Sequence, residues 1–434
     1  MRSFPQTLET VLKQPFLTNP DWDRFSETLS NLLPTIGEGE AVLCAEKDPV
    51  EALAVFFAVV LNNGGAFFAN PGWKKAEWKQ VNVLTGFHKI FGCSAIEADP
   101  SRASLFDEAR IMIPSGGTTN GIRFCVHTLY TLSSAVESLY RFHGETTLSS
   151  INPLPVFHVS GLMPVLRALL TGGLVELAAW NAIESGDFPL RPGARTSISL
   201  VPTQVARLVK MDKGLQFLHG FDSIYVGGAR TPPGLVNLIR TEKLPVLFVY
   251  GMTETAAMVV AGTRAETDSL GGIWGQALPG VTIQLTDDQE VLLKTKALFR
   301  GYFPDDSEIQ EYQTGDIGQW ITTGLFQVLG RKDFLINTGG EKVNPEEVEA
   351  VLSDCLSGAL VAVSSLPDDE WGDILVAVIE PDFDSADLDA LRKTLEGHLA
   401  SHKIPKRFIT GKTIPRTVLG KVNRSKLRTL LLEE

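Results

Sequence analysis

The chain has 434 residues, of which 44% are hydrophobic and 21% are charged. This composition is typical of a folded globular protein and excludes a disordered, collagen-like or coiled-coil chain. Its 51 acidic and 39 basic residues give a formal net charge of −12, which would repel phosphate backbones, so we expect no nucleic-acid partner.

The beginning of the chain has no pattern typical of export or membrane insertion. Residues 1–16 lack the apolar segment of a signal peptide, and the apolar run at residues 52–61 is too short to cross a bilayer. A second run, at residues 161–180, is interrupted by charged residues and glycines and is predicted to be core. The four cysteines are dispersed, without the spacing of a metal site or a disulfide framework. We therefore expect a cytoplasmic protein with reduced thiols and no membrane partner.

Four short apolar runs predict buried parallel strands, because each is followed at once by glycine, serine, threonine or proline. They are residues 110–114, 197–201, 223–226 and 245–249. Segments with helical spacing of apolar residues, such as residues 132–139, lie between them. The pattern predicts an α/β fold that binds its ligands at the loops beyond the carboxyl ends of the strands.

From about residue 270 the pattern changes to alternating segments such as VTIQLT and EVLLKT. These predict antiparallel strands, which we expect to form a small distorted barrel. Further on, Asn344 is a predicted helix cap with Pro345 in the first turn, and two strand-like runs and a second helix follow. The predicted architecture is a large N-terminal domain of mostly parallel sheets flanked by helices, at residues 1–332, and a small α+β domain at residues 333–434.

The loop at residues 115–123, SGGTTNGIR, has the groups needed to bind a polyphosphate. Its glycines free the backbone, its hydroxyls can donate hydrogen bonds, and its final arginine is positively charged. It is not a Walker A motif, because Ile122 and Arg123 stand where that motif has Lys followed by Ser or Thr. Taken alone, a simple glycine-rich turn is an equally good interpretation.

Four further motifs follow this loop in order. They are YGMTET at residues 250–255, TGD at residues 314–316, GRKD at residues 330–333 and PRTVLGK at residues 415–421. Together with the loop they resemble the acyl-adenylate-forming superfamily of acyl-CoA synthetases, adenylation domains and firefly luciferase. The resemblance extends from about Ile113 to Arg424, whereas residues 1–110 match only loosely. It implies the two-domain fold of that superfamily and an ATP-dependent activation of a carboxylic acid.

The resemblance implies that the loop holds the β- and γ-phosphates of ATP. Ser115, Thr118 and Thr119 match the hydroxyls that contact these phosphates, and Arg123 stands at the position usually held by Lys. Residues 120–122 depart from the usual Gly-x-Pro, which leaves the path of the loop open. For the three hydroxyls, capping of a turn is the alternative role.

The YGMTET motif is similar to the segment that binds adenine and the metal. Tyr250, followed by Gly251, matches the aromatic residue that stacks on adenine, and Thr253 matches a phosphate-contacting hydroxyl. Glu254 matches the carboxylate that holds Mg²⁺ against the phosphates, a hard oxygen ligand for a hard cation. A solvated loop carboxylate is the alternative interpretation of Glu254.

Other matches imply contacts to the nucleoside. Asp316 matches the acidic residue that accepts hydrogen bonds from both ribose hydroxyls, and Arg331 the basic residue beside it; a surface ion pair is the alternative. Gly228 and Ala229 are similar to the loop that lines the adenine and acyl sites, although small residues after a strand are often only a tight turn.

The last motifs imply a mobile small domain. Lys421 matches the lysine that bridges the acyl carboxylate and the α-phosphate during adenylation, where a cation stabilises the developing charge. Asp333 matches the hinge between the two domains. Gly339 and Gly340 match the loop that approaches the pantetheine channel in the thioester-forming arrangement, with a simple turn as the alternative.

Three further segments, PVFHVSGL, SLVPTQVARL and YVGGAR, narrow the resemblance to the 2-succinylbenzoate–CoA ligases of menaquinone and phylloquinone biosynthesis. His158 would lie near the acyl and pantetheine sites, where shaping the pocket is favoured over proton transfer. Thr203, Gln204 and Arg230 are candidates for binding the second carboxylate, and a structural role suits each of them equally well.

The implied activity is an AMP-forming acid–CoA ligase that uses ATP, Mg²⁺ and coenzyme A. It forms an acyl-adenylate and then an acyl-CoA thioester. Because the chain ends soon after Lys421, we expect coenzyme A rather than a fused carrier domain as the acceptor. The alternatives are a ligase for another aryl or medium-chain acid, an enzyme that loads a carrier protein, and a non-catalytic adenylate-binding protein.

Overall fold

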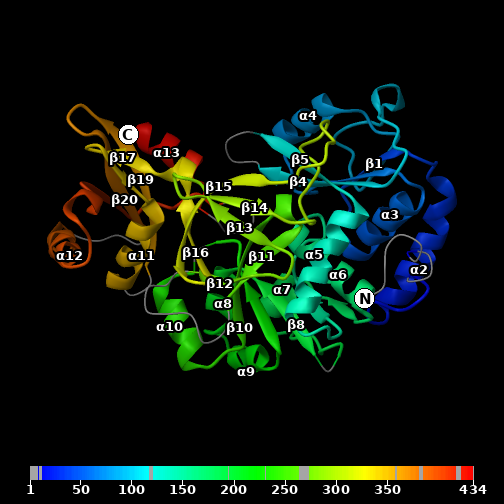
Figure 1. The fold of residues 1–434 in the computed structure, drawn as a ribbon, viewed down its shortest axis with the longest axis horizontal. Helices are drawn as coiled ribbons and strands as arrows, with labels where there is room; N and C mark the ends of the chain where they lie inside the picture. Colours follow the sequence, from blue (N-terminus) through cyan, green and yellow to red (C-terminus); the bar gives the residue numbers. More distant parts are fainter. Residues whose placement is uncertain are drawn as a thin grey trace.

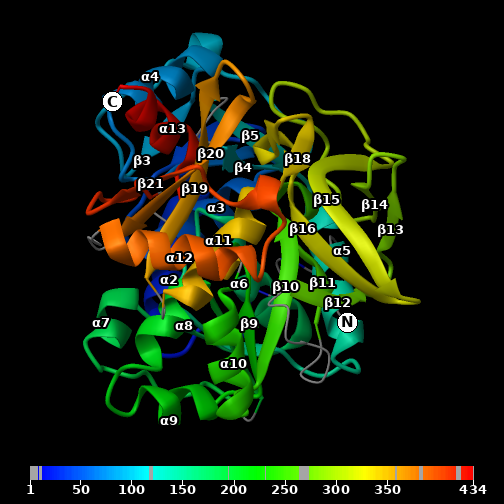
Figure 2. The same cartoon turned by 90° about the vertical axis from the view of Figure 1, so that its left-hand side faces the viewer.

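The computed structural model describes residues 8, 12–116, 121–193, 195–229, 231–262, 273–356, 359–380, 385–416 and 422–433. Over these residues the chain forms three sheets, of five, eleven and five strands, with helices on their faces (Figures 1 and 2). This arrangement confirms the expected α/β class. Within the same ranges, no helix combines the length and the apolar character that crossing a bilayer requires.

The first sheet has the strand order β3-β1-β2-β4-β5 and lies at the right-hand side of Figure 1. Its strands are β1 (Ala41–Cys44), β2 (Gly65–Phe68), β3 (Lys89–Phe91), β4 (Arg110–Gly116) and β5 (Ile122–His127), with helices α2 (Asp21–Leu32), α3 (Pro49–Leu61) and α4 (Lys75–Leu84). The pairs among β1 to β4 are parallel, whereas β5 runs antiparallel to β4. The apolar run at residues 52–61 belongs to α3, which is buried almost all round, as expected of a core helix.

The second sheet joins parallel and antiparallel strands in the order β13-β14-β15-β16-β12-β11-β10-β9-β8-β6-β7. They are β6 (Ser149–Asn152), β7 (Val175–Leu177), β8 (Thr196–Leu200), β9 (Ser223–Val226), β10 (Val246–Met252), β11 (Ala257–Ala261), β12 (Ile273–Ala277), β13 (Thr282–Leu285), β14 (Glu290–Lys294), β15 (Tyr312–Thr322) and β16 (Leu325–Arg331). The strands predicted from apolar runs are β4, β8, β9 and β10. The antiparallel strands expected after residue 270 attach to the parallel ones through β11 and β10.

One face of the parallel strands β6, β8 and β9 is unusually polar. Ser150, Ser197 and Ser223 occupy paired positions on this face, while the isoleucine after each serine lies on the opposite face in an apolar core. Helices α5 (Leu129–Phe142) and α6 (Val159–Thr171) lie over the serine face, and α8 (Pro202–Leu208), α9 (Gly214–His219) and α10 (Pro233–Thr241) cover the isoleucine face. A parallel sheet is normally apolar on both faces, so the serine face needs an explanation.

The third sheet belongs to the C-terminal part of the chain, drawn in orange and red at the left of Figure 1. It contains β17 (Ile336–Thr338), β18 (Glu341–Val343), β19 (Leu360–Asp368), β20 (Gly372–Glu380) and β21 (Arg407–Thr410), with α11 (Pro345–Cys355), α12 (Ser385–Glu396) and α13 (Arg424–Leu432). Asn344 caps α11 as predicted, because its side chain accepts a hydrogen bond from the amide of Glu346 at 3.0 Å. The predicted strands and the second helix are also present.

A buried ion pair fixes α13 to the rest of this unit. The guanidinium of Arg424 makes two hydrogen bonds of 2.8 and 2.9 Å to the two carboxylate oxygens of Glu349, and it donates a third, of 3.1 Å, to the carbonyl of Val363. Both charged side chains are largely buried. The pair therefore ties α13 to α11 and to β19.

We predict that Arg424→Ala lowers the free energy of unfolding by about 3 to 5 kcal/mol, because it leaves the Glu349 carboxylate buried without its partner. Urea unfolding followed by circular dichroism measures the change. The control is Arg428→Ala in the same helix, which removes an exposed side chain 3.6 Å from Asp373 and should cost less than about 0.5 kcal/mol. The double variant Arg424→Met/Glu349→Leu should regain most of the lost stability. Equal losses in Arg424→Ala and Arg428→Ala would contradict the prediction.

Candidate active site

The candidate site forms where the carboxyl ends of strands from two sheets meet. Ser115 lies at the end of β4 in the first sheet, and Glu254 follows β10 of the second. The hydroxyl of Ser115 donates a hydrogen bond of 2.9 Å to Oε1 of Glu254, although the two residues are far apart in the sequence. Glu254 is only 7% exposed. The structure thus brings together Ser115 of the predicted phosphate loop and the predicted metal carboxylate.

A tyrosine that no motif indicated completes the surroundings of Glu254. The hydroxyl of Tyr302 donates to the same oxygen, Oε1, at 2.7 Å, and lies 3.0 Å from the hydroxyl of Tyr312. Tyr302 comes from the loop between β14 and β15, and Tyr312 begins β15. Aromatic residues in such a loop carry no sequence signal of function, so only the tertiary structure identifies them.

Arg123 lies beside the same tyrosine. Its guanidinium carbon is 4.0 Å from the centroid of the Tyr302 ring, and its buried Nε has no hydrogen-bond partner within the described residues. Arg123 is in β5, where it pairs with Ser115 across the antiparallel β4–β5 ladder. The loop therefore connects two strands, unlike a Walker A loop, which leads from a strand into a helix. Thr118 and Thr119 lie outside the described residues.

The residues predicted to bind the nucleoside also come together. The hydroxyl of Tyr250 donates a hydrogen bond of 2.6 Å to Oδ2 of Asp316, and Nη1 of Arg331 lies 3.5 Å from Oδ1 of the same carboxylate. Asp316 and Arg331 occupy paired positions on β15 and β16. Burial raises the pKa of Tyr250, and the adjacent Asp316 raises it further, so the phenol stays protonated and acts as a donor.

Backbone geometry explains two glycines at the site. A Cβ on Gly251 would lie 1.7 Å from the carbonyl oxygen of Ala257, so only glycine fits at this irregularity in the β10–β11 ladder. Gly228, after β9, has φ +81°, which favours glycine. Gly228 and Ala229 follow β9 at the same edge of the sheet from which Tyr250 and Glu254 project.

Of the residues proposed for a second carboxylate, the structure describes Thr203 and Gln204. Thr203 and Gln204 are in the first turn of α8. The side-chain carbonyl of Gln204 accepts a hydrogen bond of 3.0 Å from the amide of Val201, the N-cap residue of that helix. Arg230 lies outside the described residues. His158 is the N-cap residue of α6, with its ring 4.7 Å from that of Phe157.

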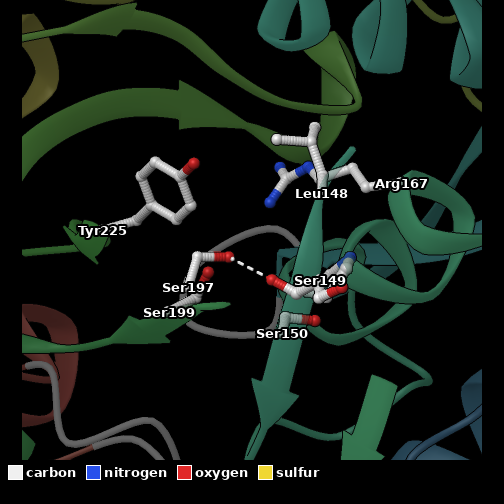
Figure 3. A pocket seen from close by; sticks show the side chains of 8 residues that line it. Leu148, Ser149, Ser150, Arg167, Ser197, Ser199 and Tyr225 are labelled. Atoms are coloured by element: carbon white, nitrogen blue, oxygen red, sulfur yellow. Dashed lines mark hydrogen bonds between the residues drawn. The ribbon is translucent and has the colours of Figure 1, made fainter. Parts of the chain in front are cut away.

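A narrow polar pocket lies between α6 and the serine face of the second sheet (Figure 3). Arg167 projects from α6 toward Tyr225 of β9, and serines from β6 and β8 line the opposite wall. The lining residues are Leu148, Ser149, Ser150, Pro164, Arg167, Ser197, Ser199 and Tyr225. Ser150 and Ser197 of the serine face line the pocket, whereas Ser223 does not.

Arg167 is a buried cation without a carboxylate partner in the part of the chain that the structure describes. It is 6% exposed, its Nε has no hydrogen-bond partner there, and burial lowers its pKa to about 10. Its guanidinium carbon lies 5.8 Å from the Tyr225 ring, whose hydroxyl is 2.7 Å from Nε2 of His143. A buried charge of this kind normally has a counter-ion, and the described residues supply none to Arg167. In the sequence, Arg167 only interrupts an apolar run that is predicted to be core, so no motif indicates its role.

The structure describes three of the residues that were predicted for the C-terminal unit, namely Asp333, Gly339 and Gly340. Asp333 follows β16, is exposed, and accepts a hydrogen bond of 3.0 Å from Nη2 of Arg331. Gly339 and Gly340 connect β17 to β18 with φ +58° and +85°, and a Cβ on Gly339 would lie 2.7 Å from the ring of Trp371. Lys421 lies outside the described residues.

Comparison with known proteins supports the expected family. The AMP-binding enzyme family model matches residues 95–303, and the model of the AMP-binding enzyme C-terminal domain matches residues 347–421. The chain is 32% identical to a 2-succinylbenzoate–CoA ligase of Listeria monocytogenes over 81% of this chain and 79% of that protein. A 2-succinylbenzoate–CoA ligase of Staphylococcus epidermidis is 29% identical over 75% of this chain and 70% of its own length.

Solved structures share the fold. The o-succinylbenzoate CoA synthetase of Bacillus subtilis, in complex with its acyl-adenylate intermediate, has a TM-score of 0.76 at 22% identity and covers 93% of this chain and 91% of its own. ATP-bound MatB of Rhodopseudomonas palustris has a TM-score of 0.78 at 22% identity, with coverages of 94% and 92%. From the matched family models, and from the identity and coverage of the curated relatives, the chain belongs to the AMP-binding enzyme family.

Proposed function

We propose that this protein is an AMP-forming 2-succinylbenzoate–CoA ligase that acts in menaquinone or phylloquinone biosynthesis. The relatives from Listeria monocytogenes and Staphylococcus epidermidis carry this name, and family membership supports the ATP-dependent chemistry. The observation that carries the choice of acid is the buried, unpartnered cation of Arg167. A dicarboxylic acid uses one carboxylate in the reaction and offers the other as the missing counter-ion.

The geometry of α6 supports binding of such an acid along this helix. His158 is at its start, near the edge of the sheet where the nucleotide residues gather, and Arg167 lies nine residues further on. Nine residues correspond to about 13 Å along a helix axis, and helical side chains lean toward the N-terminus, which shortens the distance that the acid has to span. In this proposal His158 shapes the pocket near the reacting carboxylate.

Adenylation is the first half-reaction. A carboxylate oxygen of the acid attacks the α-phosphorus of ATP, an acyl–phosphate bond forms, and pyrophosphate leaves. We assign the ribose to Asp316 and Arg331, the adenine to Tyr250 with Gly251, Gly228 and Ala229, and the phosphates to Thr253 and the loop with Ser115, Thr118, Thr119 and Arg123. Lys421 would neutralise charge between the carboxylate and the α-phosphate.

Glu254 is suited to Mg²⁺ by the chemistry of its surroundings. It is a single buried carboxylate next to a phosphate loop, and no group of three or more His, Cys, Asp or Glu residues forms an alternative metal site within the described residues. Mg²⁺ is commonly held by one or two carboxylates together with substrate phosphates. When bound, the ion neutralises charge on the phosphates of ATP.

Thioester formation is the second half-reaction. The sulfur of coenzyme A attacks the acyl carbon of the adenylate, the thioester forms, and AMP leaves. We propose that the small domain, residues 333–434, turns about Asp333 relative to residues 1–332 between the two half-reactions, and that Gly339 and Gly340 then line the path of the pantetheine arm. All four cysteines are free, as suits the cytoplasm, where we place the enzyme.

We predict that the wild-type enzyme releases AMP with 2-succinylbenzoate, ATP, Mg²⁺ and coenzyme A, and that Arg167→Met lowers kcat/KM for this acid roughly 100-fold because the second carboxylate loses a buried ionic partner. Activity with benzoate, which has no second carboxylate, should stay within about threefold of wild type. The control is Arg141→Met, an exposed arginine of α5. Similar losses with both acids would contradict the proposed role. Preference for another acid, or no AMP release with any acid, would contradict the proposed function.

We also predict that Lys421→Ala slows adenylation by about 10² to 10³-fold, since a cation that stabilises the transition state is lost. Thioester formation from preformed acyl-adenylate should remain within about threefold of wild type, because the lysine acts only in the first half-reaction. Rapid-quench assays of each half-reaction provide the measurement. Lys426→Ala, which removes an exposed cation in α13, is the matched control. Equal loss in both half-reactions would contradict the domain-alternation mechanism.

A further inference from the structure

Tyr302 contacts two of the proposed ATP-binding groups at once. Its hydroxyl donates to Oε1 of Glu254 at 2.7 Å, and its ring lies 4.0 Å from the guanidinium carbon of Arg123. One group is the proposed metal carboxylate and the other is the proposed phosphate cation. Tyr302 is therefore the side chain through which the two are held in a common arrangement.

The backbone around Tyr302 is anchored to the strand that carries Arg123. Tyr302 forms an antiparallel bridge with Cys125 of β5, and the amide of Phe303 donates a hydrogen bond of 2.9 Å to the carbonyl of Phe124. The Phe303 ring packs edge-on against that of Phe67 in the first sheet, with centroids 5.0 Å apart. These contacts fix the position of the tyrosine relative to both of its partners.

The hydroxyl of Tyr302 acts on the orientation of the Glu254 carboxylate. Oε1 accepts hydrogen bonds from both Ser115 and Tyr302, and neither hydroxyl uses Oε2. Donors to one oxygen of a ligating carboxylate fix its rotation and leave the other oxygen for a cation. Loss of such a supporting hydrogen bond typically costs 10- to 100-fold in metal affinity or activity.

The ring of Tyr302 acts on the cation. Arginine is planar and stacks on aromatic faces, whereas lysine is a compact point charge. Arg123 occupies the position at which the superfamily usually has Lys, and here its guanidinium lies over an aromatic ring. Contact with the ring restricts the guanidinium, and a lysine at this position would gain less from the ring.

We propose that Tyr302 is a positioning residue for ATP, whose hydroxyl orients Glu254 toward the magnesium ion and whose ring supports Arg123 against the phosphates. The inference rests on the proposed ATP-dependent function. The two roles belong to different parts of one side chain, so Tyr302→Phe removes only the first and Tyr302→Leu removes both.

The test measures the affinity of the full-length chain for a non-hydrolysable ATP analogue by calorimetry, with excess Mg²⁺ and with EDTA. We expect Tyr302→Phe to weaken binding about 10-fold in Mg²⁺ and less than twofold in EDTA. Tyr302→Leu should weaken binding under both conditions. In the Arg123→Lys background, Tyr302→Leu should cause a smaller loss in EDTA than it does beside Arg123, because a lysine gains less from the ring. Tyr130→Phe and Tyr130→Leu, made at an exposed tyrosine of α5, are the matched controls.

The inference is overturned if Tyr302→Phe responds to Mg²⁺ as wild type does, or if it loses the same factor in Mg²⁺ and in EDTA. It is also overturned if the wild-type affinity does not depend on Mg²⁺. The binding assay contains no acid, so it does not depend on the identity of the substrate. A chain that gives the expected binding pattern but forms no adenylate from 2-succinylbenzoate would refute the proposed substrate and still support the role of Tyr302. Steady-state AMP release adds a second readout: Tyr302→Phe should raise the half-saturating Mg²⁺ concentration about 10-fold.

Discussion

The buried carboxylate of Glu254 lies where the two large sheets meet, and the proposed nucleotide site depends on its hydrogen bonds. A buried carboxylate without donors is strongly unfavourable, so both sheets must supply polar groups at this point. Ser115 does so from the first sheet. His127, in β5 of the same sheet, supports the backbone next to Glu254. Its Nε2 lies 2.8 Å from the carbonyl oxygen of Thr253, which can only accept, so this nitrogen carries the proton. Burial lowers the pKa of His127 to about 4, which keeps the ring neutral in this role.

Arg167 presents the opposite electrostatic situation. Glu254 has its donors within the chain, whereas the described residues offer Arg167 no carboxylate. The serines of β6 and β8 give the cation a polar but uncharged surrounding, which lowers the cost of burial without neutralising the charge. This missing counter-ion is the basis of the proposed choice of a dicarboxylic acid.

A single side chain relates the proposed ribose contact to the proposed hinge. Arg331 ends β16, and its two terminal nitrogens lie 3.5 Å from Asp316 and 3.0 Å from Asp333. In the proposed mechanism, a turn about Asp333 alters the contact between Arg331 and Asp333. The contact between Arg331 and Asp316 remains and supports the bound ribose. The C-terminal unit follows directly from β16. The end of this strand therefore carries both the proposed ribose contact and the start of the C-terminal unit.

The sequence by itself determined the fold class, and it predicted most of the residues of the proposed nucleotide site. Apolar runs followed by glycine or serine predicted β4, β8, β9 and β10, because buried parallel strands need continuous apolar stretches and their loops need special backbone conformations. Local motifs likewise predicted Glu254 and Asp316. Only the tertiary structure identified Tyr302 and Arg167. Tyr302 is significant because it contacts Glu254, which is far away in the chain, and Arg167 because it is buried without a carboxylate partner among the described residues. Burial and long-range contacts leave no local pattern in the sequence.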